Sequence, residues 1–223
     1  MNIVLNGGQG KMGRTIIELC KKKHSDINFF VVDREKTDES YNLSELEDKN
    51  IDGIIDFSSP SGTLQIIEFA LKINRPILIG TTGISENDFK KIELASQKIP
   101  VFYSPNMSIG VNICFHIADI LSKKLDCDIH IHETHHKAKK DIPSGTALRF
   151  KGIMEKNGKK VLITSSRIGD ITGEHQLDFA MDGEKITLQH VAYRREIFAS
   201  GAVTAFIWLC KKQAGLYNFD DMF

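Results

Sequence analysis

Apolar and polar residues follow two different patterns in the two halves of the chain. In the first half, short apolar runs occur near residues 3–5, 29–32, 53–57, 76–80 and 101–103, and most are followed by a segment with apolar spacing near 3.6. Short apolar runs bounded by turn residues are typical of strands buried on both faces, and the longer period is typical of helices. This alternation predicts an α/β fold, a Rossmann-like doubly wound parallel sheet over about 105 residues.

Local signals refine this picture. Ser61 is expected to cap a helix that ends near Ile73, and Ser85 to cap one that ends near Lys98, because serine side chains accept hydrogen bonds from the first turn of a helix. Residues 37–50 are polar and are expected to form a connection with one helical turn near residues 43–46.

The second half changes to strand alternation and a hairpin. After a helix expected at 108–124, Ile129 and Ile131 alternate with His130 and His132. A helix is predicted from Ser144 to about residue 156, and extended runs at 176–181 and 185–193 meet at Asp182-Gly183, a strong hairpin signal. This predicts a second α+β domain with a mixed or antiparallel sheet.

The helix predicted at 197–211 is so apolar that it must be buried, and we expect it to return to the first domain. The predicted domains are therefore residues 1–106 with 196–223, and residues 107–195.

Composition narrows the function classes. The 223 residues include 29 basic and 29 acidic ones, so the chain has no overall attraction to nucleic acid or to an anionic membrane. No apolar run reaches the roughly 18 residues of a membrane span, and the start shows no secretion signal. The four cysteines are far apart in the sequence and have apolar neighbours, which predicts buried, reduced thiols in a cytoplasmic protein.

A glycine-rich turn follows the first strand. Gly7, Gly10 and Gly13 have the spacing G-x-x-G-x-x-G, a variant of the dinucleotide-binding fingerprint, although such a turn can also exist without a ligand. Asp33 ends the next strand 20 residues later, where an acid would hold the ribose hydroxyls, and Arg34 could accept a 2′-phosphate. The sequence thus predicts binding of NADH, NADPH or both. The expected contact residues are Gly7, Gly8, Gln9, Gly10, Lys11, Met12, Asp33, Arg34, Gly80, Thr81, Thr82, Ser104, Pro105, Asn106 and Met107.

The stretch from His132 to Ala147 is rich in residues that can take part in catalysis or bind a charged ligand. It holds three histidines, three lysines and two acids, and it joins a predicted strand to a predicted helix start. Helix N-termini bind anions, and the cations add to this, so we expect a small substrate with carboxylates. One alternative is a solvated charged loop.

A second alternative is zinc, because residues 132–136 match H-E-x-x-H. That motif needs a helix, and in a strand the outer histidines lie about 13 Å apart, too far for one ion. No metal is therefore expected.

Taken together, several motifs resemble the 4-hydroxy-tetrahydrodipicolinate reductase (dihydrodipicolinate reductase) family of bacterial lysine biosynthesis. They are residues 7–13, 56–58, 80–83, 105–112, 133–147, 169–175 and 198–202. The resemblance implies a Rossmann-type domain, a second domain for substrate binding and homotetramer formation, and NAD(P)H-dependent reduction of a cyclic dicarboxylate imine in lysine and diaminopimelate biosynthesis. Two departures concern the short segment between Asp33 and Gly53, which affects the adenosine pocket, and Lys140, where the family more often has an uncharged residue.

The resemblance also implies roles for particular residues. His135 and Lys139 are the candidate proton donors, with Lys139 favoured. The expected substrate-binding residues are His136, Gly145, Thr146 and Arg195. Three other functions stay open: another nicotinamide-dependent reductase such as an amino-acid dehydrogenase, a non-catalytic NAD(P)H-binding sensor, and a zinc hydrolase.

Overall fold

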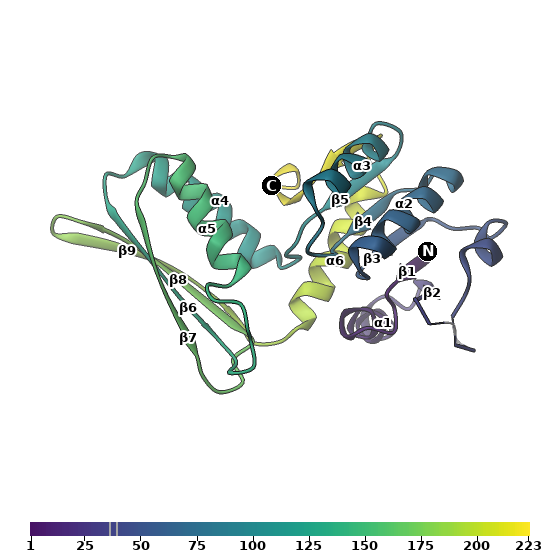
Figure 1. Ribbon diagram of the computed structural model, residues 1–223, viewed down its shortest axis with the longest axis horizontal. Helices are drawn as coiled ribbons and strands as arrows, with labels where there is room; N and C mark the ends of the chain where they lie inside the picture. Colours follow the sequence, from purple (N-terminus) through teal and green to yellow (C-terminus); the bar gives the residue numbers. More distant parts are fainter. Residues whose placement is uncertain (36, 39) are drawn as a thin grey trace. The chain divides into compact units, whose positions relative to one another are not determined.

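The computed structural model describes residues 1–35, 37–38 and 40–223, so position 39 of the expected connection lies outside the described residues. The chain folds into two compact units (Figure 1). The first consists of Met1–Ser108 and Glu196–Phe223, and the second of Ile109–Arg195.

The first unit contains a six-stranded parallel sheet in the order β10-β5-β4-β3-β1-β2. Its strands are β1 (Asn2–Asn6), β2 (Asn28–Val32), β3 (Gly53–Asp56), β4 (Ile77–Ile79), β5 (Pro100–Tyr103) and β10 (Gly215–Tyr217). The continuous apolar runs form the buried centre, with Val4, Ile54 and Leu78 fully buried. This confirms the predicted doubly wound α/β fold. The edge strand β10 was not predicted, because Gly215-Leu216-Tyr217 does not form a continuous apolar run as the three residues of β4 do.

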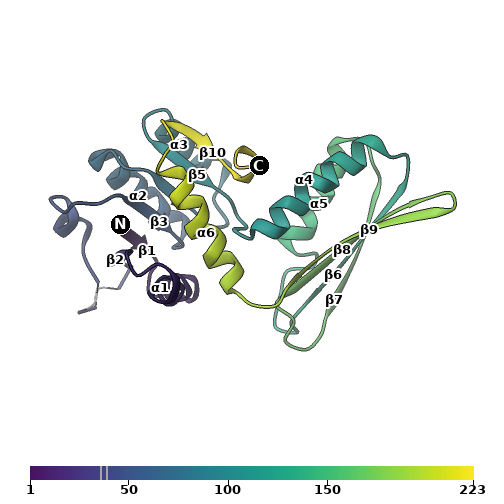
Figure 2. The same cartoon turned by 180° about the vertical axis from the view of Figure 1, so that it is seen from behind.

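Helices of the first unit complete its core. They are α1 (Lys11–Lys23), α2 (Pro60–Ile73), α3 (Glu86–Ser96) and α6 (Glu196–Leu209), with the 3-10 helices η1 (Leu43–Leu46) and η2 (Phe219–Asp221). The apolar helix α6 packs against α1, β4 and β5, as Figure 2 shows from behind. Ser85 caps α3 as predicted, but the cap of α2 is Ser59, so the prediction of Ser61 was wrong. Pro60 occupies the first helical position, which moves the helix start two residues earlier.

The second unit is a four-stranded mixed sheet in the order β7-β6-β8-β9, with α4 (Ile109–Lys124) and α5 (Gly145–Lys156) along one face (Figure 1). The strands are β6 (Asp128–His135), β7 (Val161–Arg167), β8 (Gly173–Met181) and β9 (Glu184–Ala192). The predicted hairpin joins β8 and β9, and Gly183 has φ +82°, which favours glycine there. Strand β7, parallel to β6, was not predicted.

Strand alternation positions the polar residues of this unit. Ile129, Ile131, Leu177 and Phe179 are buried in the core that includes the helix residue Phe150. Because side chains on one face recur every second residue, Glu133, His135 and His175 continue the same buried face toward one end of the sheet. The helix-covered face of this sheet is therefore apolar in its middle and carries three buried polar side chains at one end.

Two predictions about composition can be compared with the structure. Cys20 and Cys114 are buried free thiols, whereas Cys127 and Cys210 are half-buried, so burial was predicted correctly for two of the four. Within the described residues, none of the helices is long and apolar enough to cross a membrane.

Candidate active site

In the first unit, two pockets of about 400 and 460 Å³ lie along the carboxyl ends of the parallel strands, the edge where such sheets bind ligands. Most of the predicted cofactor residues line them. Those in the first pocket are Gly10, Lys11, Met12, Gly80, Thr81, Thr82, Pro105, Asn106 and Met107, and those in the second are Gly7, Gln9, Gly10, Asp33 and Arg34. Gly8 and Ser104 are buried and line neither pocket.

The glycine-rich turn is tightly packed. Gly7 has φ +78°, and a Cβ there would lie 2.5 Å from the carbonyl oxygen of Phe57. A Cβ at Gly13 would lie 2.4 Å from the Cα of Gly8, so the start of α1 packs directly on the turn. The N-terminus of α1, with Gly10 and Lys11, therefore opens into the first pocket, and this geometry fits a dinucleotide pyrophosphate.

Asp33 ties the turn to the end of β2. Its carboxylate accepts hydrogen bonds from the backbone N–H groups of Gln9 at 3.0 Å and Arg34 at 2.8 Å. Gln9 Nε2 also donates to Thr37 Oγ1 at 2.7 Å. The carboxylate thus lines the second pocket with its position fixed by the turn, where a ribose would need it.

Sequence reasoning missed a polar group behind these pockets. The buried Asp56 carboxylate accepts hydrogen bonds from the side chains of Asn6, Ser58, Thr63 and Thr81. Burial raises the pKa of Asp56, and these four hydrogen bonds oppose the rise. Since Ser58 and Thr81 line the first pocket, Asp56 holds two of its walls together. Phe57, Ser58 and Phe198 are further lining residues outside the predicted set.

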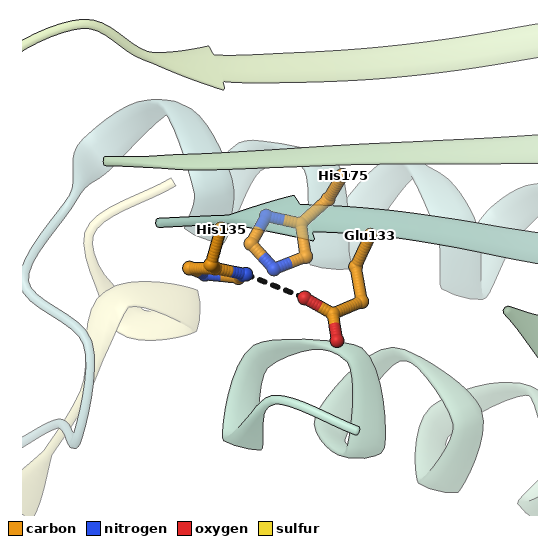
Figure 3. Close-up of side chains that lie close together, drawn as sticks. All are labelled: Glu133, His135 and His175. Atoms are coloured by element: carbon orange, nitrogen blue, oxygen red, sulfur yellow. Dashed lines mark hydrogen bonds and ion pairs between the residues drawn. The ribbon is translucent and has the colours of Figure 1, made fainter. Parts of the chain in front are cut away.

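In the second unit, Glu133, His135 and His175 lie close together at the end of β6 and the start of β8 (Figure 3). His135 Nδ1 is 2.5 Å from Glu133 Oε2, and the His135 and His175 rings meet edge to face with centroids 5.1 Å apart. Glu133 is fully buried and His135 is 7 % exposed.

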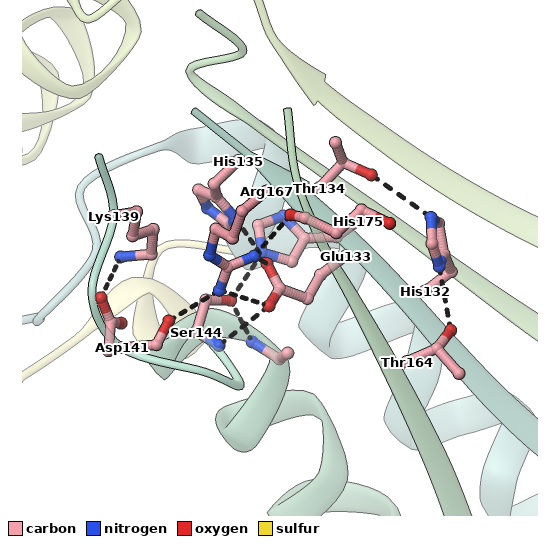
Figure 4. Close-up of polar contacts among 12 residues, drawn as sticks. His132, Glu133, Thr134, His135, Lys139, Asp141, Ser144, Thr164, Arg167 and His175 are labelled. Atoms are coloured by element: carbon pink, nitrogen blue, oxygen red, sulfur yellow. Dashed lines mark hydrogen bonds and ion pairs between the residues drawn. The ribbon is translucent and has the colours of Figure 1, made fainter. Parts of the chain in front are cut away.

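Arg167, at the end of β7, binds both oxygens of Glu133, with Nη2 2.7 Å from Oε1 and Nη1 3.0 Å from Oε2 (Figure 4). The backbone N–H of Ser144 adds a hydrogen bond to Oε1 at 3.2 Å. Burial tends to raise the pKa of Glu133, but the hydrogen bonds from Arg167, Ser165 and His135 outweigh it and lower the pKa to about 2. The carboxylate is therefore ionised at any physiological pH.

The two imidazoles of this cluster lose basicity for a common reason. Burial is the largest cause that lowers the pKa of His135, and the nearby Lys139 and Arg167 add to it, whereas Glu133 acts in the opposite direction. Burial lowers the pKa of His175 to about 3. His175 Nε2 is hydrogen-bonded to Ser144 Oγ at 3.2 Å, and its buried Nδ1 has no hydrogen-bond partner among the described residues. His175 is thus a neutral member of the cluster.

Glu133, His135 and His175 could in principle offer three ligand atoms to a metal ion. This group differs from the H-E-x-x-H string considered above, whose residues lie in strand β6 and not in a helix. Both Glu133 oxygens are already bound to Arg167, whose charge repels a cation. The surroundings therefore favour a hydrogen-bond network over a metal centre.

Lys139 lies in the loop between β6 and α5, with Nζ 2.8 Å from Asp141 Oδ1. The hydrogen bond from Lys139 is the largest cause that lowers the pKa of Asp141, and the backbone N–H of Gly145, at the first position of α5, adds to it. Lys139 thus already holds a carboxylate in this structure.

The remaining predicted substrate residues are placed differently. His136 is half-buried directly after His135, and its backbone N–H donates to the Ile171 carbonyl at 2.7 Å. Thr146 is half-buried in the first turn of α5. Arg195 is exposed at the end of the second unit, and no hydrogen bond or ion pair among the described residues joins it to the cluster.

Both units of the chain match one known protein family. Residues 1–107 match the family described as dihydrodipicolinate reductase, N-terminus, and residues 110–223 match dihydrodipicolinate reductase, C-terminus. The chain belongs to the dihydrodipicolinate reductase family. It is therefore an oxidoreductase that uses a nicotinamide cofactor, as the resemblance of its motifs had predicted.

Relatives in this family align over nearly the whole chain. The chain is 41 % identical over 241 residues to 4-hydroxy-tetrahydrodipicolinate reductase of Rickettsia rickettsii (strain Sheila Smith), covering 100 % of this chain and 99 % of that one. It is 37 % identical to the protein of the same name from Campylobacter jejuni subsp. jejuni serotype O:23/36, covering 99 % and 98 %. A dipicolinate-bound dihydrodipicolinate reductase from Paenisporosarcina sp. TG-14 shares the fold, with a TM-score of 0.86, 21 % identity and coverage of 98 % and 97 %.

Proposed function

We propose that the chain reduces 4-hydroxy-tetrahydrodipicolinate to tetrahydrodipicolinate with NADH or NADPH, a step of lysine and diaminopimelate biosynthesis. The observation that carries the proposal is the group formed by His135, His136 and Lys139 between the end of β6 and the start of α5. The names of relatives at about 40 % identity support the substrate.

Cofactor binding is assigned to the pockets of the first unit. The N-terminus of α1 would hold the pyrophosphate, and Asp33 would accept hydrogen bonds from the adenosine ribose. Arg34 lies next to it and offers a partner for a 2′-phosphate, so we propose that both cofactors are used, with NADH at least as good. The bound nicotinamide supplies a hydride.

The substrate chemistry explains the need for a proton donor. Loss of the 4-hydroxyl group as water leaves a cyclic imine conjugated with a ring double bond. When a hydride enters the conjugated ring carbon, negative charge moves toward the ring nitrogen, which must then take up a proton. Lys139 is the proposed donor, because its ammonium carries a transferable proton, and His135 is the proposed partner.

The two substrate carboxylates need cationic or N–H partners. We assign one to His136 and to the start of α5 at Gly145 and Thr146, where helix N–H groups point outward. That Asp141 forms an ion pair with Lys139 in this structure supports the suitability of Lys139 for a carboxylate. Arg195 is assigned to the same substrate only from the family resemblance.

A spectrophotometric assay at 340 nm tests the proposal. Purified protein, freshly made cyclic substrate and each reduced cofactor should give substrate-dependent oxidation of the cofactor, and omission of substrate is the control. Slow turnover of the cyclic substrate with faster turnover of an amino acid would indicate an amino-acid dehydrogenase. Cofactor binding without any turnover would indicate a sensor.

We also propose a homotetramer. In the second unit, α4 and α5 cover one face of the sheet, whereas the other face carries polar residues such as His130, His132 and Thr164. Self-association supplies a cover for one-sided sheets. Light scattering that finds a stable monomer at micromolar concentration contradicts this proposal.

A further inference from the structure

We propose that Glu133, held by Arg167, is a positioning residue that fixes the His135 imidazole as the Nδ1–H tautomer and leaves Nε2 as a hydrogen-bond acceptor. The inference rests on the proposed function for the part that His135 plays in the reaction. The tautomer itself follows from the contacts within the second unit and can be measured separately.

The hydrogen bond between His135 and Glu133 determines where the proton is. A carboxylate can only accept a hydrogen bond, so the ring nitrogen 2.5 Å from Oε2 must carry a hydrogen. Arg167 and the Ser144 N–H stabilise the ionised carboxylate, and the low pKa of Glu133 agrees with this. Neutral His135 is therefore a donor at Nδ1 and an acceptor at Nε2.

The other charged groups around His135 favour its neutral form. Arg167 faces it from β7 and Lys139 from the loop after β6, and both positive charges oppose a second proton on the ring, whereas His175, which faces it from β8, is neutral. Among the described residues around the ring, only Glu133 favours that second proton. A neutral ring without an Nε2 hydrogen cannot donate a proton to the substrate, which assigns the donation to Lys139 and leaves His135 to accept a hydrogen bond from the reacting groups.

Gly173 provides an independent check on Nε2. A Cβ added at Gly173 would lie 3.0 Å from His135 Nε2 and 3.4 Å from Cδ2, so a side chain there would press on this nitrogen. No described residue is hydrogen-bonded to Nε2, and glycine at position 173 keeps the approach to it clear. Gly173→Ala should therefore reduce kcat while leaving the tautomer unchanged.

Nitrogen NMR of the full-length protein labelled with ¹⁵N-histidine measures the tautomer directly. Above the pKa of His135, the spectrum should contain an imidazole signal with a protonated Nδ1 and an unprotonated Nε2 that is absent from His135→Gln. In Glu133→Gln the ring should lose this single tautomer, and kcat should fall about tenfold or more. The Kd for NADH should not change. Because Glu133 raises the pKa of His135, the acid limb of the kcat profile should move to lower pH in this variant.

The matched control is Glu155→Gln, which removes an exposed carboxylate paired with Lys151 at 3.5 Å and should change none of these readouts. If the wild-type spectrum shows His135 as the Nε2–H tautomer, the proposal is wrong. This measurement needs no variant at Glu133, so the proposal can be tested even if Glu133→Gln does not fold. Normal kcat in a folded Glu133→Gln protein that has lost the tautomer also overturns it. If His135→Gln keeps full kcat while the wild type shows Nδ1–H, the proposed role of His135 fails and the tautomer assignment stands.

Discussion

The Lys139 ammonium and the Asp141 carboxylate form an ion pair, with Nζ 2.8 Å from Oδ1. Lys139 is half-buried, and the pair lies in the loop that joins His135 to the first turn of α5. A cation in this place can attract a substrate carboxylate, donate a proton, or do both. Kinetics can separate these roles, because a group used only in the transition state changes kcat, whereas a group that binds substrate and transition state equally changes KM.

The first prediction is that Lys139→Ala lowers kcat by about 10²-fold or more, the usual size of a general-acid contribution. The Kd for NADH, measured by fluorescence, should hardly change, because the proposed nucleotide contacts belong to the first unit. Lys151→Ala, on the exposed side of α5, is a control with full activity expected. Near-normal kcat with a raised KM would make Lys139 a carboxylate clamp only.

His136 and His135 are adjacent but have different surroundings. His135 is bound to Glu133 and buried, whereas His136 is half-buried in the loop and belongs to none of the side-chain hydrogen bonds of the Glu133 cluster. We predict that His136→Ala raises KM about tenfold with little change in kcat, as for the loss of one charge-assisted hydrogen bond, while His135→Ala lowers kcat. Steady-state kinetics over a range of substrate concentrations measures both. The reverse pattern would exchange the proposed roles.

Asp33 allows a prediction about cofactor choice. Asp33→Ala removes an acceptor for the ribose hydroxyls, and it also releases the Gln9 N–H at the glycine-rich turn. We expect KM for NADH to rise about tenfold and KM for NADPH to rise less, because Arg34 still offers a partner to the 2′-phosphate. Equal changes for both cofactors would mean that Asp33 supports the turn and does not contact the ribose.

The sequence pattern was sufficient for elements with a strong local signal. Continuous apolar runs predicted the central parallel strands, and the alternation at Ile129 and Ile131 correctly placed the histidine-rich stretch in a strand. That strand assignment excluded the helix that a zinc-protease motif requires. The hairpin at Gly183 was also local, because two residues determine the turn.

Two members of the cluster around Glu133 and His135 were not predicted, because they come from distant parts of the chain. Strand β7 follows helix α5 in the chain and pairs in parallel with β6. Only this pairing brings Arg167 opposite His135. Strand β7 ends in Ser165, Ser166 and Arg167, a polar run that is typical of a loop. Only the structure shows that Arg167 binds Glu133 of the neighbouring strand. His175 falls just before the apolar run from which β8 was predicted, although extending the alternation by one step from Leu177 reaches it. That alternation was the one available signal.

The Glu133–Arg167 pair leads to a prediction about stability. Both side chains are largely buried, with Arg167 11 % exposed, so Glu133→Gln leaves a buried guanidinium without its counter-charge. Breaking one side of such a pair costs about 3 kcal/mol or more in proteins. Urea unfolding at pH 7 should show a loss of this order for Glu133→Gln, and almost none for the exposed control Glu155→Gln.

The same pair predicts how this loss depends on pH. Folding lowers the pKa of Glu133 from 4.5 to about 2, and a lowered pKa means that the ionised form is the one the fold stabilises. Its contribution is therefore complete above about pH 4.5 and is lost as the pH falls toward 2. The difference in unfolding free energy between wild type and Glu133→Gln should stay constant from pH 7 to 5 and then shrink as the pH falls below 4.5. If the difference does not change down to pH 3, the Glu133 carboxylate is not held in its ionised form by Arg167, and the argument for the His135 tautomer loses its electrostatic basis.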